Sequence, residues 1–306
     1  MQKQMKQLSL ADGLVNGGNS FLQDADALID WTGLENELNG IYGSDTGRPS
    51  YPLLVMFKTL ILQQWYGLSD PGMEEALSDR ISFRRFVGLS LSDAIPDHST
   101  ISRFRTKLGD RLERLMSSLN AQFEQSGFII KRGTMMDASF IKAASSKNGV
   151  DTDAGRYGRH PDRSVTGYKA HVGTDQGSGI VRRVIVTPAN VNDTVVADGL
   201  ELGDESAVYA DKAYDKDARR ERLAKRGVFV GIMHRPCPGR PLTAAQVLFN
   251  KQLTKVRAAV ERVFAVLKLH YRLRVTRYVG LMRVATQVTL AVMAMNIKRA
   301  LVLSKT

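Results

Sequence analysis

The chain has 306 residues and a formal net charge of +12, with 43% hydrophobic and 24% charged residues. These values fit a soluble globular protein large enough for two domains, and no repeat or low-complexity tract argues otherwise. The single cysteine, Cys237, excludes an internal disulfide and predicts a reducing, cytoplasmic location. The most apolar run, residues 53–68, is too short and too polar to cross a membrane, and the polar N-terminus lacks a signal-peptide core.

The positive charge is concentrated in the last third of the sequence. Residues 212–306 contain 21 Lys and Arg residues against 4 Asp and Glu residues. Such a basic region predicts a polyanionic partner, and we expect nucleic acid. A basic surface that serves only solubility is the alternative.

Helical patterns dominate the first part of the chain. Apolar residues from Leu28 to Ile41 recur at helical spacing and predict a helix that packs in the core or on a second subunit. A further helix is predicted over residues 53–68, ending at Gly67. The dipeptide Asp70-Pro71 is predicted to cap and open the next helix, because proline is favoured in the first helical turn.

The segment 96–108 resembles the second helix of a helix-turn-helix unit. Asp97 is the expected N-cap, and an apolar face of Ile101, Phe104 and Leu108 backs a polar, basic face. In such units, the N-terminal residues of the second helix meet base edges. An ordinary amphipathic helix with a solvated face is the alternative. The residues predicted to contact DNA here are His98, Ser99, Ser102, Arg103, Arg105 and Lys107.

Strand patterns begin after Gly127. We therefore predict a helical, DNA-binding domain over residues 1–127 and a second domain over residues 128–306. Period-two alternation predicts a hairpin of residues 168–175 and 181–186. The other predicted elements are strands over 128–130, 135–141, 207–211 and 228–233, and helices over 195–200, 217–226, 245–268 and 284–303.

Between the first two strand regions, residues 143–166 are polar, glycine-rich and basic. We predict a long loop, which is often functional, and a surface insertion is the alternative. The complete order of elements predicts a mixed α/β sheet flanked by helices. This order matches a ribonuclease H-like fold, in which carboxylates lie on the first strand, at the end of the fourth strand and on a later helix.

Three carboxylates occupy the corresponding places. Asp137 and Asp211 lie in apolar, strand-like surroundings, where an unpaired charge is unfavourable, and Glu261 lies on the helix over 245–268. Two divalent ions held by such a set can clamp the attacking and leaving oxygens of a phosphodiester, and Mg²⁺ prefers oxygen ligands. A structural ion pair is the alternative for each aspartate, and a surface salt bridge with Arg257 is the alternative for Glu261.

Several motifs resemble those of bacterial insertion-sequence transposases with a DDE catalytic triad, in the group founded by insertion sequence five. The similarity runs from about Tyr51 to the last helix and includes the segments 96–105 and 187–193. Met136-Asp137-Ala138-Ser139 matches the first Asp motif of the family, and Ala210-Asp211-Lys212-Ala213-Tyr214 matches the second. Arg257, Glu261 and Lys268 fit the third motif in register, whereas Thr254 stands where the family has Tyr.

This resemblance implies a DNA transposase that binds the ends of its element, cleaves DNA strands and joins the 3′ ends to target DNA. It implies that Asp137, Asp211 and Glu261 hold two Mg²⁺ ions, for which Mn²⁺ can substitute. The expected partners are double-stranded DNA, as terminal inverted repeats and as target, and a second copy of the chain in at least a homodimer. The expected location is the bacterial cytoplasm, with no membrane association.

Further residues are candidates for phosphate contacts, namely Lys169, His171, Lys212, Arg257 and Lys268. Two alternatives remain open for the activity. One is an inactive transposase descendant that acts only as a DNA-binding protein. The other is a ribonuclease H-like nuclease that cuts without joining.

Overall fold

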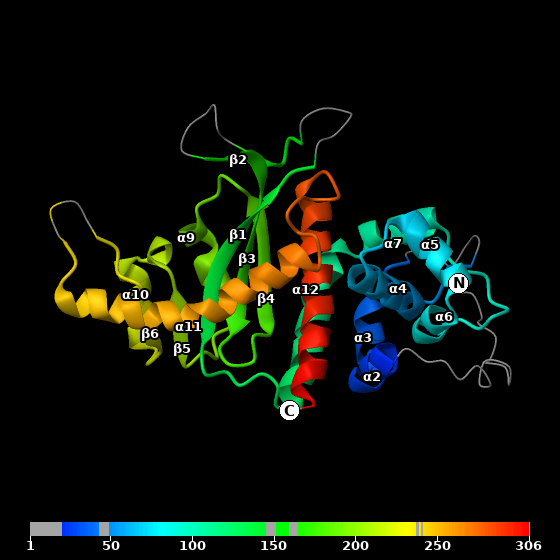
Figure 1. Cartoon of the computed structure of the whole chain (residues 1–306), viewed down its shortest axis with the longest axis horizontal. Helices are drawn as coiled ribbons and strands as arrows, with labels where there is room; N and C mark the ends of the chain where they lie inside the picture. Colours follow the sequence, from blue (N-terminus) through cyan, green and yellow to red (C-terminus); the bar gives the residue numbers. More distant parts are fainter. Residues whose placement is uncertain are drawn as a thin grey trace. The chain divides into compact units, whose positions relative to one another are not determined.

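The chain folds into two compact units, shown in the computed structural model of Figure 1. The structure describes residues 20–42, 49–144, 151–158, 165–236, 239 and 241–305, without the side chain of Asp110. The helical unit comprises Met1–Gln125 and Thr289–Thr306, and the sheet unit comprises Ser126–Val288. The last helix, α12 (Leu281–Leu303), contributes residues to both units, whereas the predicted division assigned all of it to the second domain.

The helical unit is built from short helices with local caps. Where one helix was predicted between Leu28 and Ile41, the chain breaks, because the Asp30 side chain accepts hydrogen bonds from the backbone N–H groups of Thr32 and Gly33 and starts a new helix. The helices before α12 are α2 (Ser20–Leu28), α3 (Trp31–Leu38), α4 (Leu53–Tyr66), α5 (Asp70–Asp79), α6 (Ile81–Val87), α7 (His98–Lys107), η1 (Gly109–Arg111) and α8 (Leu112–Gln125).

Two helix ends in this unit can be compared with the ends predicted from the sequence. Helix α4 ends at Gly67, which adopts the left-handed conformation with φ 64°, as predicted. The predicted cap of α5 was wrong by one residue. The Ser69 hydroxyl, not the Asp70 carboxylate, accepts a hydrogen bond from the Gly72 N–H at 3.1 Å. Asp70 is therefore available for a different contact, described below.

The sheet unit contains a mixed sheet in the order β2-β3-β1-β5-β6, with β4 also paired to β3. Strand β3 runs antiparallel to β1, β2 and β4, and β5 runs parallel to β1 and β6. This arrangement confirms the predicted α/β, ribonuclease H-like fold class. The strands are β1 (Thr134–Lys142), β2 (Gly155–Tyr157), β3 (Val165–Asp175), β4 (Val181–Pro188), β5 (Ala207–Ala210) and β6 (Phe229–Ile232).

Two strand predictions in this unit were wrong. Residues 128–130 do not form a strand, and β2 forms inside the segment 143–166 that was predicted to be a loop. Strand β2 exists because its three residues pair with the first residues of β3, a contact that local composition does not reveal. Residues 145–150 and 159–164 of that segment, which include Lys147 and Arg159, lie outside the described residues.

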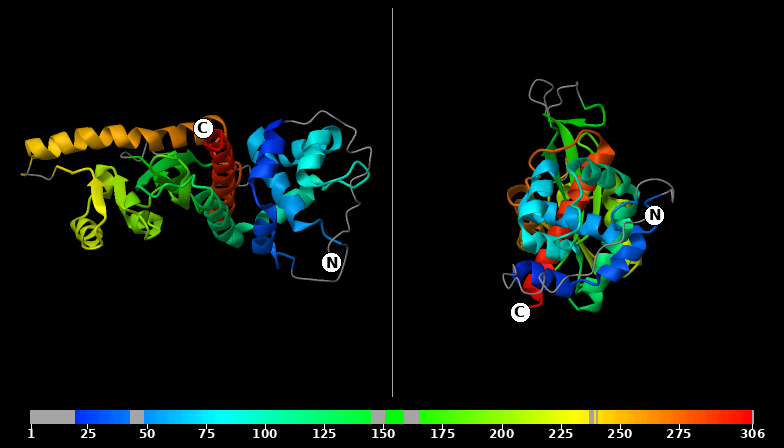
Figure 2. Two further views of the ribbon diagram at one scale, coloured as in Figure 1. Left: turned by 90° about the horizontal axis from the view of Figure 1, so that it is seen from below. Right: turned by 90° about the vertical axis from the view of Figure 1, so that its right-hand side faces the viewer.

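Helices cover both faces of the sheet (Figure 2). Helix α11 (Ala244–Leu269) contacts β1 and β5 on one face. On the other face, Met136, Val208 and Ala210 join an apolar cluster with Leu223 and Tyr214. The shorter helices are α9 (Asp193–Val196), η3 (Ala197–Leu200), η4 (Lys212–Tyr214) and α10 (Asp217–Lys225). None of the helices described has the length and hydropathy needed to cross a membrane.

Candidate active site

Asp137 and Asp211 come together at the end of two parallel strands. The last paired residues of β1 and β5 are Met135 and Tyr209, and each aspartate lies two positions beyond them. Because side chains alternate along a strand, the register places both carboxylates on one face of the sheet, the face covered by α11. Beyond this pair the ladder ends, so the two carboxylates border an unpaired edge of β1.

Arg257 of α11 bridges these two aspartates. Its Nη2 lies 3.3 Å from Oδ2 of Asp137, and its Nη1 lies 3.9 Å from Oδ2 of Asp211. Nη1 also donates to the Met233 sulfur at 3.6 Å. The guanidinium is only 13% exposed. A single positive group thus neutralises two partly buried carboxylates, which would otherwise repel one another.

Backbone groups orient the same carboxylates. The Ala138 N–H donates to Oδ1 of Asp137 at 2.8 Å, and the Ala213 N–H donates to Oδ1 of Asp211. Burial raises the pKa of Asp137, and negative charge on Asp211 and Asp193 adds to this, whereas the Ala138 hydrogen bond and Arg257 lower it. A cation next to the Asp137 carboxyl group would therefore strongly favour its charged form.

Glu261, the third predicted carboxylate, is not part of this contact. It lies one turn beyond Arg257 on α11 and is exposed. Within the described parts of the chain, no three His, Cys, Asp or Glu side chains lie close enough together to hold a metal ion. The structure therefore brings Asp137 and Asp211 together and leaves Glu261 outside their immediate contact.

The residues nonetheless suit a hard divalent cation. Asp137 and Asp211 already share one positive group, so the space between them accommodates a cation. Carboxylate oxygens are ligands that Mg²⁺ prefers, and Mg²⁺ keeps several waters, so that one or two protein carboxylates suffice. Among the three predicted carboxylates, these two aspartates are the ones that could hold such an ion together.

A further acidic residue, Asp193, lies near the site and was not among the predicted site residues. Its Oδ1 lies 2.8 Å from Nζ of Lys169 and 4.0 Å from Nδ1 of His171. Asp193 begins α9, five residues after the end of β4. The signal that could have identified it is its place in the segment 187–193, which resembles a motif of the transposase family.

Two predicted phosphate contacts, Lys169 and His171, point into the sheet unit. Lys169 is occupied by Asp193 and by the Val191 carbonyl at 2.9 Å. His171 is fully buried, and its Nε2 bonds to the Thr187 hydroxyl at 2.9 Å. Burial lowers the pKa of His171 to about 4, so the ring is neutral near pH 7. These positions argue against direct phosphate contacts.

The other basic candidates of the sheet unit differ in accessibility. Lys212 is exposed beside Asp211, and Lys268 is half-buried near the end of α11. Arg257 is occupied by the two aspartates. Lys212 and Lys268 therefore remain able to meet a phosphate directly, and Arg257 would first have to leave its carboxylate partners.

Helix α7 presents most of its predicted DNA contacts on its surface. Asp97 caps the helix as predicted, accepting from the Thr100 N–H at 2.8 Å. His98 bonds to Glu74 at 2.8 Å, and the Arg103 guanidinium donates to Oγ of Ser99 at 2.8 Å. The exposed residues of the predicted set are His98, Ser99, Ser102, Arg103 and Lys107.

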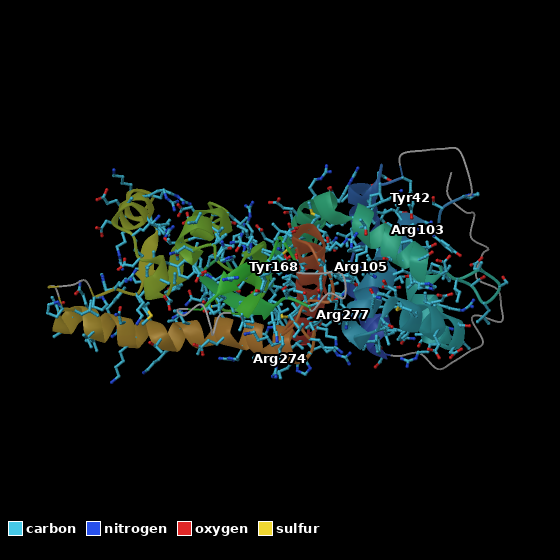
Figure 3. The ribbon with its side chains drawn as sticks, turned by 90° about the horizontal axis from the view of Figure 1, so that it is seen from above. Tyr42, Arg103, Arg105, Tyr168, Arg274 and Arg277 are labelled. Carbon is cyan, nitrogen blue, oxygen red and sulfur yellow. The ribbon has the colours of Figure 1, made fainter. Side chains whose placement is uncertain are left out.

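Arg105 is the exception on this helix, because its burial contradicts the predicted contact with DNA. Its guanidinium is buried and donates to Oδ2 of Asp70 at 3.0 Å and to Oε1 of Gln63 at 3.1 Å. Figure 3 marks Arg105 and the exposed Arg103 on the same helix. Arg105 thus fastens α7 to α4 and α5, because a buried guanidinium needs a charged partner.

Replacing Arg105 should therefore destabilise the helical unit. Arg105→Ala leaves the Asp70 carboxylate without its ion-pair partner, so we expect the free energy of unfolding to fall on the order of 3 kcal/mol. Urea unfolding followed by circular dichroism measures this loss. The matched control is Arg103→Ala, where an exposed arginine of the same helix should change stability by about 0.5 kcal/mol or less. Equal stability of the two variants would contradict the structural role of Arg105.

Comparison with known protein families agrees with this architecture. Residues 130–297 match a family model described as a transposase DDE domain. Residues 10–107 match a second family model, described as a transposase domain (DUF772). The first match covers more than half of the chain and includes β1, which carries Asp137, β5, which Asp211 directly follows, and α11, which carries Glu261.

Proposed function

The chain belongs to the DDE transposase family, and on that premise we propose that it binds the ends of an insertion sequence, cleaves DNA strands there and joins the freed 3′ ends to target DNA. The motif resemblance supports a place in the group founded by insertion sequence five. The observation that carries the proposal is the meeting of Asp137 and Asp211 around one positive group, Arg257.

Asp137, Asp211 and Glu261 are the proposed metal ligands. Divalent ions, two Mg²⁺ or Mn²⁺ in this family of reactions, stabilise the charge that develops on the attacking and leaving oxygens of a phosphodiester. Asp137 and Asp211 supply the rigid part of the site because they follow directly from paired strand residues. Glu261 lies one helical turn from Arg257, and its longer side chain can approach the aspartates as Arg257 withdraws.

Arg257 has two roles in this proposal. In the structure it balances the charge of Asp137 and Asp211. A phosphate of bound DNA offers it another partner, since a guanidinium matches phosphate oxygens as well as it matches carboxylates. Lys212 and Lys268, which are accessible near the same elements, are the other proposed phosphate contacts of the sheet unit.

Helix α7 is the proposed DNA-binding element of the helical unit, consistent with the predicted DNA-binding domain over residues 1–127. Its accessible face carries Arg103 and Lys107, while Arg105 is excluded because it is buried. The hydrogen bonds from Arg103 to Ser99 and from Ser99 to Asp97 hold the arginine before any ligand binds. Such preorganisation reduces the entropy lost on binding.

Arg103→Ala should weaken the affinity for element-end DNA by about 1–3 kcal/mol if this side chain reads a base edge, and sequence preference should relax at that position. Fluorescence anisotropy with element-end DNA and unrelated DNA measures both effects. Arg114→Ala is the matched control, because Arg114 is an exposed arginine on α8 of the same unit. If the two variants bind alike, α7 does not provide specific contacts.

One experiment tests the proposed function against its alternatives. The full chain is incubated with labelled element-end DNA, Mg²⁺ and a target plasmid. Joined product supports a transposase. Cleaved but unjoined ends favour a nuclease of the same fold, and a mobility shift without cleavage favours an inactive DNA-binding descendant. We further propose at least a homodimer in the DNA complex, because two element ends must be handled together.

A further inference from the structure

Helix α11 carries three basic side chains on its outer face, and this set, Lys251, Lys255 and Arg262, is called the α11 stripe below. At 3.6 residues per turn, the three positions lie within about 40° of one another around the helix and roughly opposite its buried side. All three residues are exposed, and α11 runs along the outside of the sheet unit (Figure 2). The buried side of α11 consists of Leu253, Val260, Val263, Phe264 and Leu267.

The cations of the α11 stripe do not take part in the ion pairs of the sheet unit. Among the residues that the structure describes, none forms a hydrogen bond or an ion pair with their side chains. Other basic side chains of this unit are paired, such as Arg182 with Asp204 at 2.7 Å and Arg220 with Asp215 at 2.6 Å. Positive charge gathered on one helix face without compensation is typical of a surface that binds a polyanion.

The stripe side of α11 is free of acidic residues. Glu261 is the only acidic residue among the 26 residues of the helix. It directly precedes Arg262, so it lies about 100° around the helix from that side chain, on the side of Arg257. The other positions between and beside the cations include the small residues Ala258 and Ala265. An extended anionic partner can therefore approach the whole stripe closely.

The length of the stripe suits the backbone of duplex DNA. A helix rises 1.5 Å per residue, so the Cα atoms of Lys251 and Arg262 lie about 16 Å apart along the axis. One strand of a duplex carries a phosphate about every 3.4 Å of its axis, so this length spans about five phosphates. Three long side chains can each meet one of them. Such contacts carry no sequence information, because every nucleotide presents the same phosphate.

A second copy of the chain fits this face less well than DNA does. Two apolar residues near the ends of the stripe, Leu248 and Leu269, are 58% and 61% exposed and would favour a contact between proteins. However, two copies that shared this face around a two-fold axis would place like charges against one another. No acidic residue of α11 lies on that side to offset the repulsion. The charge therefore favours DNA.

The cations of the stripe also differ from those of α7 in how they are held. Arg103 on α7 is fixed by its hydrogen bond to Ser99, which suits the reading of a defined sequence. The stripe cations have no such contact among the described residues, which suits phosphates in any sequence. Of the two DNA partners in the proposed reaction, the element end has a fixed sequence, whereas the target is a foreign duplex. The stripe therefore fits the target.

We propose that the α11 stripe binds the phosphate backbone of target DNA and holds it along the helix that carries Glu261. This inference rests on the proposed function, in which freed 3′ ends are joined to target DNA. It adds Lys251, Lys255 and Arg262 to the DNA contacts of the sheet unit, and none of these residues belongs to the motifs that resemble those of the family. Binding through phosphates alone is independent of sequence and depends strongly on salt.

Lys255→Ala combined with Arg262→Ala tests the contact with DNA. The affinity of the full chain for a labelled duplex of unrelated sequence is measured by fluorescence anisotropy at several salt concentrations. Loss of two phosphate contacts should weaken binding on the order of 10-fold near physiological salt and reduce the slope of log K against log salt by about 2. Because both side chains are exposed, the Tm should stay that of the chain without substitutions.

Arg132→Ala combined with Lys225→Ala is the matched control. It also removes one arginine and one lysine, so the net charge falls by the same amount. Both side chains are exposed, and neither forms an ion pair within the described parts of the chain. Lys225 lies on α10, whose Leu223 packs on the sheet face opposite α11. If the stripe variant and the control variant show the same salt slope, the stripe does not contact DNA and the inference is overturned.

The joining reaction separates target DNA from element ends. Both variants are incubated with labelled element-end DNA, Mg²⁺ and a target plasmid. The fraction of cleaved ends that become joined to the plasmid should fall on the order of 10-fold in the stripe variant, and lower salt should restore it. An unchanged joined fraction would show that the stripe does not serve the target, and would overturn the inference even if the salt slope changes.

Failure of the proposed function itself would look different. If the chain without substitutions neither cleaves nor joins, the proposed function is refuted, while the salt slopes still decide whether the stripe binds duplex DNA. Sedimentation velocity on the same variants tests the other occupant. Loss of a dimer in the stripe variant, with an unchanged salt slope, would show that this face joins two copies of the chain and would overturn the inference.

Discussion

Asp137→Ala and Asp211→Ala should each lower the rate of element-end cleavage by about 1,000-fold or more, while binding of the same DNA should stay nearly unchanged. Loss of one ligand removes metal-ion stabilisation worth several kcal/mol in the transition state, and each 1.36 kcal/mol corresponds to a factor of ten in rate. DNA affinity is retained because it depends on basic groups elsewhere. Single-turnover cleavage and anisotropy binding, measured on the same preparations, check both parts.

The control for this experiment is Asp217→Ala. Asp217 is an exposed aspartate at the start of α10 in the same unit, and no contact of its side chain with the site is present among the described residues. Its replacement should change neither rate nor affinity. Cleavage by Asp137→Ala at a rate near that of the unchanged protein would remove the central residue from the mechanism.

We expect Glu261→Gln to have the second large effect, a loss of DNA cleavage with little change in stability. Glu261 is exposed and outside the contact of Arg257 with the aspartates, so its replacement should alter the free energy of unfolding by about 0.5 kcal/mol or less. Cleavage should nevertheless collapse at every salt concentration, because glutamine keeps the size and helix propensity but loses the charge that holds the ion. Urea unfolding and cleavage assays at several salt concentrations measure the two effects.

Lys268→Ala provides the contrast on the same helix. This change removes a phosphate partner and no metal ligand. Its defect should appear mainly as weaker DNA binding, and lower salt should partly rescue it by strengthening the remaining phosphate contacts. If Glu261→Gln instead cuts at a near-normal rate, Glu261 is a surface residue paired at most weakly with its helix neighbours. Asp137 and Asp211 would then need a different partner, for which Asp193, whose charge raises the pKa of Asp137, is a candidate.

Local sequence determined most of the secondary structure of this protein. Gly67 ends α4 because it tolerates the left-handed conformation, and Asp97 starts α7 because its side chain accepts a backbone N–H. Alternating residues encoded the hairpin of β3 and β4. The same local pattern located Asp137 on a strand and Asp211 directly after one. A lone carboxylate in an apolar run stands out, because burying an unpaired charge is unfavourable.

Only the tertiary structure decided where the long basic side chains point. Arg103 and Arg105 are two residues apart on α7, yet one is exposed and the other is buried against Asp70, 35 residues earlier in the chain. Helical spacing tells which residues share a face, but it does not tell which face finds a distant partner. The same applies to Arg257, which reaches Asp137 across 120 positions of sequence.

The sequence likewise did not predict which residues surround the two aspartates. Arg219 ties η4, which follows Asp211, to α9, which begins with Asp193, and β1 and β5 pair in one particular register. Asp193 does not stand out locally, since it begins a short helix. The sequence by itself thus determined which carboxylates sit at strand ends. Long-range packing decided which cation faces them, because side-chain contacts depend on partners that no local pattern encodes.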